Sequence, residues 1–131
     1  FLPGDVERAR HMALRSMEDA QEHELTRALA RSQRLLGRIL AASGHPAGAD
    51  VYFEKALGIF SRHEMRLDYA RALNGYGVTL LQRSVRGEPA FTRGLAYLQE
   101  AHTIFVACKA TIDITWVERI LNHYNYENAR V

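Results

Sequence analysis

The sequence predicts an all-α protein, an antiparallel helix-pair solenoid of about six helices. Three observations support this fold class. Apolar residues recur every three or four positions along most of the chain, which is the period of one helix face. Short segments such as residues 43–46 (Ser-Gly-His-Pro) interrupt that period. Finally, the pattern around Gly37 returns around Gly77, forty residues later, and such an internal repeat is typical of stacked helical units.

The central pair of helices is expected at about residues 25–42 and 46–62. Pro46 cannot continue a preceding helix but fits the first turn of a new one. Gly44 suits the left-handed residue that ends a helix. Gly37 lies inside the first helix, where glycine costs about 1 kcal/mol relative to alanine. We therefore expect Gly37 to let the second helix approach closely.

This pair resembles the tetratricopeptide repeat, in which large and small residues alternate at fixed positions of helices A and B. The matching residues are Leu36, Gly37 and Leu40 in helix A and Ala49, Phe53 and Ala56 in helix B. The resemblance extends to the long repeats of bacterial multidomain signalling and regulatory proteins. It implies a protein-interaction scaffold in signal transduction, with a concave face lined by the A helices.

The first helix is expected at about residues 5–21, as helix B of a partial repeat. A shift of forty residues lays the repeat pattern of helix B onto Ala9, Ala13, Ser16 and Ala20. Residues 22–24 (Glu-His-Glu) would form the joint that follows. Because the helix A of this repeat is missing, we expect the chain to be a fragment of a larger protein that starts within the array.

The remainder of this single domain follows the same period. Repeat 1 is expected at about residues 24–63 and repeat 2 at about 66–109, with five extra residues in the joint of repeat 2. A third-repeat helix A, or a capping helix, is expected at about residues 112–126. Gly87-Glu88-Pro89 is the predicted break within repeat 2, although Pro89 could also begin an extra helical turn.

Composition and charge narrow the class of protein. The net charge of +2 is too small to favour nucleic acid, although the isoelectric point is about 8.9. No stretch approaches the roughly 18 uninterrupted apolar residues of a membrane span. Cys108 is the single cysteine, so an intrachain disulfide is excluded, as is typical of a reducing cytoplasm. We expect a cytoplasmic protein without membrane contact.

The sequence offers no recognisable catalytic site. No glycine-rich phosphate loop follows a strand, and the six histidines lack the spacing of metal ligands. Cys108 follows an apolar run and is interpreted as a packing residue. We therefore expect no enzyme activity, no metal and no cofactor.

A polar stripe on the A helices is the strongest functional signal. Arg31, Arg34 and Arg38 share one helix face, because they are three and four positions apart. The predicted equivalents are Arg71, Asn74 and Val78 in repeat 2 and Arg119, Asn122 and Tyr126 in the last helix. In peptide-binding tetratricopeptide proteins, such positions grip backbone amides and a terminal carboxylate. The resemblance thus implies that an acidic or C-terminal peptide binds there, from another protein or from the same one.

Three other interpretations remain open at this point. In an arginine-rich chain the stripe could be an ordinary solvated face. Arginine ladders could also bind nucleic acid, which the small net charge disfavours. The last helix carries Trp116, Ile120 and Tyr124, and this apolar surface could make the chain a homodimer by self-association of terminal helices.

Overall fold

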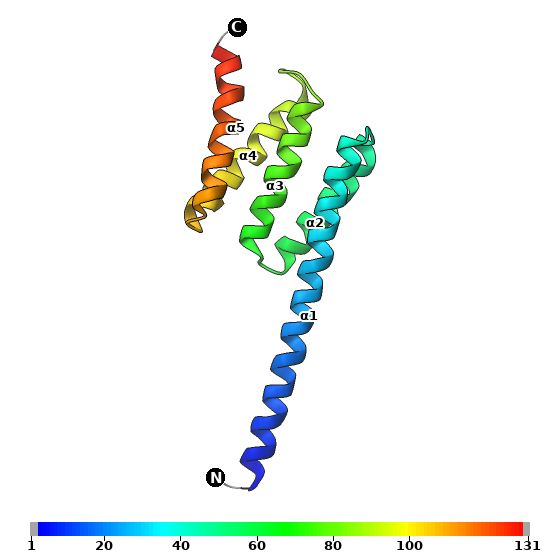
Figure 1. Ribbon diagram of the computed structural model, residues 1–131, viewed down its shortest axis with the longest axis vertical. Coiled ribbons are helices and arrows are strands. Elements are labelled where there is room, and N and C mark those ends of the chain that lie inside the picture. The colour runs from blue at the N-terminus through cyan, green and yellow to red at the C-terminus, as the bar shows by residue number, and fades with distance from the viewer. Residues whose placement is uncertain (1–2, 130–131) are drawn as a thin grey trace.

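The structure, a computed structural model, describes residues 3–129 of the chain, and side chains for residues 4–125. Within that range it consists of five helices joined by short turns, with no strand, so the all-α prediction is confirmed (Figure 1). The helices are α1 (Pro3–Ala42), α2 (Pro46–Arg62), α3 (Arg66–Gln82), α4 (Pro89–Ala107) and α5 (Thr111–Ala129).

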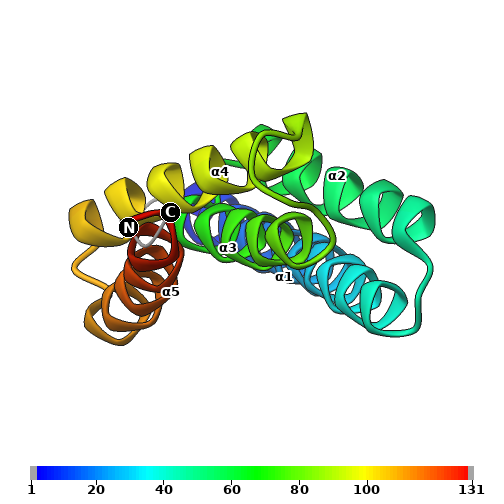
Figure 2. The same cartoon turned by 90° about the horizontal axis from the view of Figure 1, so that it is seen from above.

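Successive helices run in alternating directions and form two layers. Helices α2 and α4 lie in one layer, and α1, α3 and α5 lie in the other (Figure 2). The most extensive contacts are those of α1 with α2 and of α3 with α4. The two pairs meet where α3 contacts both α1 and α2, and α5 packs mainly on α4.

The predicted joint after α1 has the hydrogen bonds of a glycine-terminated helix. Gly44 has a φ of +81° and donates its N–H to the carbonyl of Ala41. The N–H of His45 donates to the carbonyl of Leu40, which completes a Schellman motif. Pro46 then begins α2, where its missing N–H leaves no gap in the hydrogen bonding.

The joints after α2 and α4 use the same motif without glycine. Glu64 and Lys109 occupy the left-handed position, with φ of 54° and 57°. The next residue in each turn donates its N–H to the backbone carbonyl of a core phenylalanine: Met65 to that of Phe60 and Ala110 to that of Phe105. Met65 is 5% exposed. An apolar contact after the turn therefore offsets the strain of a non-glycine residue in this conformation.

The prediction of a separate helix at residues 5–21 is wrong, and so is the expected total of about six helices. Helix α1 continues through residues 22–24 without a break and is 40 residues long. Residues 22–24 include no glycine or proline, and the apolar residue directly after them, Leu25, is exposed rather than packed in the core. The Thr26 hydroxyl donates to the carbonyl of Glu22, and Arg27 pairs with Glu24 at 2.6 Å. Local bonds thus extend the helix.

The aromatic core joins the two helix pairs. The Phe53 ring of α2 stacks on the Tyr76 ring of α3, with centroids 4.9 Å apart and an interplanar angle of 8°. Both side chains are fully buried. A Cβ at Gly37 would lie 2.9 Å from the Phe53 ring, so the predicted close approach of α2 to α1 is present. Glycine leaves room there for the ring.

The crossing of α3 and α4 depends on a second glycine contact. A Cβ at Gly77 would lie 2.9 Å from the backbone oxygen of Gly94, which cannot move aside as a side chain could. We expect Gly77→Ala to lower the free energy of unfolding by about 1–3 kcal/mol, because the two helices must separate.

Gly75→Ala is the matched control for this prediction, two positions away on the same helix. Its Cβ would meet the Phe53 ring at an ordinary distance of 3.4 Å. The gain in helix propensity should then raise stability by up to about 1 kcal/mol. Urea denaturation of both variants measures the difference, and equal effects would contradict the close approach at Gly77.

Candidate functional site

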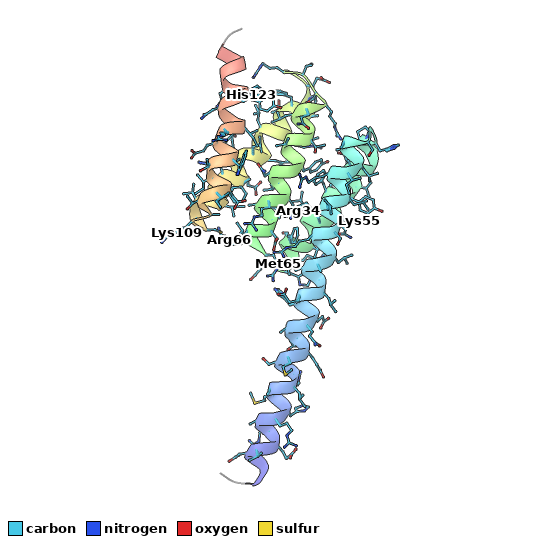
Figure 3. All side chains as sticks on the ribbon, in the orientation of Figure 1. Arg34, Lys55, Met65, Arg66, Lys109 and His123 are labelled. Carbon is cyan, nitrogen blue, oxygen red and sulfur yellow. The ribbon has the colours of Figure 1, made fainter. Side chains whose placement is uncertain are left out.

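A groove with a volume of about 770 Å³ lies between α1 and α3, on the side where α1 ends. Four of the predicted stripe residues line it: Arg34, Arg38, Arg71 and Asn74. The other walls come from the turn at Gly44 and Pro46 and from the second half of α3. Figure 3 labels Arg34 at the boundary of α1 and α3, and Lys55 on the opposite edge of α1–α2. The volume is in the usual range of ligand pockets.

Two arginines of the stripe are held by carboxylates rather than free. Arg31 Nε donates to Asp68 Oδ1 at 2.9 Å, and Arg31 Nη2 donates to Asp68 Oδ2 at 3.4 Å. Asp68 is 6% exposed and also forms an ion pair with Arg27 at 3.2 Å. A two-point contact between guanidinium and carboxylate fixes the orientation of both groups. Arg31 is therefore a structural residue that ties α1 to α3.

The same arrangement recurs between α3 and α5. Arg71 Nε donates to Asp113 Oδ1 at 3.2 Å, and Arg71 Nη2 donates to Asp113 Oδ2 at 3.1 Å. This hydrogen bonding raises the pKa of Arg71. Asp113 lies in the first turn of α5, as Asp68 lies in the first turn of α3, where the helix dipole favours a negative charge. Arg71 lines the groove, but its charge is already neutralised.

Arg34 differs from both of these arginines. Its side chain is half-buried in the groove, and no carboxylate among the described residues pairs with it. Its Nη1 atom is fully buried and has no hydrogen-bond partner in the part of the chain that the structure describes. Burial lowers the pKa of Arg34, opposed by the charge of Asp68. Because guanidinium stays protonated in proteins, the groove holds a half-buried cation that forms no ion pair with the described residues.

Two further polar groups of the groove lack partners. Asn74 Oδ1 is buried without a hydrogen bond, one turn along α3 from Arg71. An amide side chain carries both donors and an acceptor, so it can bind a peptide backbone. Arg38 is exposed at the rim of the groove, and no ion pair holds it within residues 4–125. Arg34, Arg38 and Asn74 together can accommodate a carboxylate and its adjacent amide.

The predicted ladder does not continue into α5. Arg119 and Asn122 are exposed but do not line the groove, and Arg119 lies over the Trp116 ring at 5.3 Å. The Arg71–Asp113 pair makes Asp113 of α5 the equivalent of Asp68 of α3. Three residues after each aspartate stand Arg71 in α3 and Trp116 in α5, so Trp116 occupies the position that was expected for an arginine. Tyr126 was also predicted for this site, but its side chain lies outside the described residues.

Besides Val78, which was a predicted stripe position, the groove includes two residues that the sequence did not single out, Gln82 and Arg83. Val78, Gln82 and Arg83 belong to the second half of α3 and the turn after it. Val78 and Gln82 follow Asn74 at four-residue spacing, which was the available signal. Arg83 binds Asp50 of α2 at 2.8 Å, so it closes one end of the groove without being free.

The proposed self-association surface of α5 is smaller than expected. Trp116 is 57% exposed. Ile120 and Tyr124, however, pack against the hydrophobic core, and the Tyr124 ring meets the Phe91 ring edge-on at 5.8 Å. Ile120 and Tyr124 are therefore only partly exposed, because they also pack against the core, and self-association through these three side chains stays a prediction.

The described residues were compared with the geometry of metal sites and of membrane-spanning helices. No group of three or more histidine, cysteine, aspartate or glutamate side chains with metal-site geometry occurs among the described residues. None of the helices described for residues 3–129 has an apolar stretch long enough to cross a membrane.

The difference between Arg31 and Arg34 can be tested through stability. Arg31→Gln removes one of the two positive charges that pair with the nearly buried Asp68 carboxylate. We therefore expect a loss of about 1–2 kcal/mol in the free energy of unfolding. Arg34→Gln removes a half-buried charge that forms no ion pair with the described residues, so we expect stability within about 0.5 kcal/mol of wild type, or higher. Chemical denaturation of the two variants measures this, and a larger loss for Arg34→Gln would contradict the assignment.

Comparison of the chain with protein-family models, with curated proteins and with solved structures gives no match. The geometry of the groove is therefore the basis for assigning a function.

Proposed function

We propose that this chain is a protein-interaction module, a helix-pair solenoid of the tetratricopeptide type, that binds an acidic or C-terminal peptide segment in the groove between α1 and α3. The observation that carries the proposal is the unpartnered guanidinium of Arg34, with its buried Nη1 atom facing no acceptor. A carboxylate of a peptide would supply the missing acceptor, and charge-assisted hydrogen bonds are roughly twice as strong as neutral ones.

The solenoid part of the proposal rests on repeated contacts. In each pair a glycine of the first helix lies against the second helix, Gly37 against Phe53 and Gly77 against Gly94 and Leu98. The ion pair Arg31–Asp68 has its counterpart in Arg71–Asp113. Such repetition fits stacked helix pairs, in which one layer forms a binding face. The resemblance of the sequence adds a regulatory role within a larger signalling protein.

The residues of the groove suggest how the peptide would lie. Arg34 at the floor would bind the carboxylate, and Arg38 at the rim would add a second positive charge. Asn74 would hydrogen-bond the backbone amide of the peptide residue before the carboxylate. Binding removes that amide from water, so it needs a new partner. Val78 and the Gly75 backbone would leave room for an apolar side chain between the polar contacts. Arg71 would remain with Asp113.

Fluorescence anisotropy with labelled peptides tests this proposal. The probes are acidic peptides with a free C-terminus, the same peptides with an amidated C-terminus, and neutral peptides. We expect Arg34→Gln and Asn74→Ala each to weaken binding of the acidic peptides about tenfold or more, because each removes contacts to a charged or buried group.

Arg62→Gln is the matched control, since Arg62 is an exposed arginine in the last turn of α2, away from the groove. It should leave the dissociation constant unchanged. Binding that survives Arg34→Gln would contradict the proposed groove. Tighter binding to an oligonucleotide than to any acidic peptide at physiological salt would favour a nucleic-acid function instead.

A further inference from the structure

The groove between α1 and α3 has an unusually one-sided charge. Among the described residues that line it, Arg34, Arg38, Arg71 and Arg83 are basic, and none is an aspartate or a glutamate. None of these lining residues is a histidine either, so the charge of the lining stays constant between about pH 5 and pH 8. A ligand that fills this groove must therefore bring negative charge with it.

Two of the four arginines are already neutralised by aspartates. Arg83 Nη2 donates to Asp50 Oδ2 at 2.9 Å. Arg71 Nε and Nη2 donate to Asp113 at 3.2 and 3.1 Å, and the two N–H groups of Arg71 Nη1 take no part in this pair. Arg71 can therefore donate further hydrogen bonds to a ligand while its charge stays paired with Asp113.

Arg34 and Arg38 carry the two positive charges of the groove that no described residue pairs. They are four residues apart on one face of α1, where like charges repel each other. Asp68 is close enough to act on the charge of Arg34, but it is already paired with two other arginines. The Arg38 side chain reaches toward α3, since its Cδ lies 3.9 Å from the position that a Cβ of Gly75 would take.

These two unpaired charges distinguish between kinds of acidic group. A carboxylate carries one negative charge, so it would leave one of the two guanidinium groups without a counter-charge. A phosphate monoester carries about −1.5 to −2 charges at pH 7 and three acceptor oxygens, which matches two cations. The planar donor set of arginine also binds phosphate oxygens in pairs. The charge of the groove therefore fits a phosphate group better than a carboxylate.

Asn74 indicates that phosphate is only part of the ligand. Its Oδ1 atom is buried and has no hydrogen-bond partner among the described residues. This oxygen needs an N–H or O–H donor, and a phosphate dianion offers only acceptors. A peptide backbone supplies N–H groups beside a phosphorylated side chain. One phosphorylated peptide can thus satisfy the buried oxygen of Asn74 and both arginines of α1.

We propose that the groove binds a peptide segment with a phosphorylated side chain, whose phosphate pairs with Arg34 and Arg38 while a backbone N–H donates to Asn74. This inference rests on the proposed peptide-binding function and names the class of its ligand. Arg71 adds hydrogen bonds through Nη1 and stays paired with Asp113. Phosphorylation of the partner segment then switches binding on.

Fluorescence anisotropy of the full chain with three sets of labelled peptides tests the inference. The peptides are short, have blocked termini, and carry a serine, a glutamate or a phosphoserine at the centre among varied neutral residues. At about pH 7.5 we expect phosphoserine peptides to bind about tenfold or more tightly than glutamate peptides, and serine peptides to show no binding.

Arg38→Gln separates the role of the second charge from that of the first. Arg38 is exposed at the rim, so the variant should fold like wild type. We expect the preference for phosphoserine over glutamate to fall to about twofold, because only one unpaired guanidinium then remains. Arg62→Gln, the exposed control on α2, should leave the preference unchanged.

Lowering the pH to about 5.5 provides an independent readout. The second pKa of a phosphate monoester is about 6, so most of the dianion is protonated and the affinity of phosphoserine peptides should fall about fourfold. Glutamate side chains and arginines stay charged at this pH, so the affinity of glutamate peptides should change little.

The outcomes separate this inference from the proposed function. Glutamate and phosphoserine peptides that bind equally well, and that both lose binding in Arg34→Gln, would overturn the phosphate inference and leave the peptide groove standing. Binding of all peptides that is independent of Arg34 would overturn both. Inorganic phosphate or free phosphoserine that binds as tightly as the phosphopeptides would show a small-anion site and overturn the inference.

Discussion

Each helix of the α1–α3–α5 layer is tied to the next by an arginine that grips an aspartate in the first turn of its neighbour. Arg31 binds Asp68 and Arg71 binds Asp113, both through two donor atoms. These pairs fix the register and the distance between neighbouring helices, because guanidinium and carboxylate meet in one favourable plane. They also neutralise two of the positive charges on this face. The charge of the groove therefore depends on the arginine that has no such ion pair.

That arginine is Arg34, one turn along α1 from Arg31. Its neighbours fix the walls around it, but none neutralises its charge. A protein that needed only stability would replace a half-buried unpaired cation by a neutral residue, since burying the charge costs free energy. Together with the buried Asn74 Oδ1 atom, which has no hydrogen-bond partner among the described residues, this arrangement supports the proposed binding role.

Much of this architecture could be predicted from the sequence, because its signals are local. Gly44 and Pro46 mark a turn through backbone preferences alone, and Gly37 and Gly77 mark close helix crossings. Residues 22–24 were expected to be a similar turn, but without a breaker or an apolar contact the helix continues. The stripe residues of α1 and α3 were also predictable from spacing, whereas those expected in α5 do not line the groove. Their pairing was not, because it depends on Asp68 and Asp113, which are 37 and 42 residues away in the chain.

Arg31 and Arg34 have opposite roles although they share a helix face. Nitrogen-15 NMR of the arginine Nε–H groups during titration with an acidic peptide tests this difference directly. We expect a large chemical-shift change for Arg34 and almost none for Arg31, whose donors are occupied by Asp68. Equal changes for both arginines, or a change confined to Arg31, would contradict it.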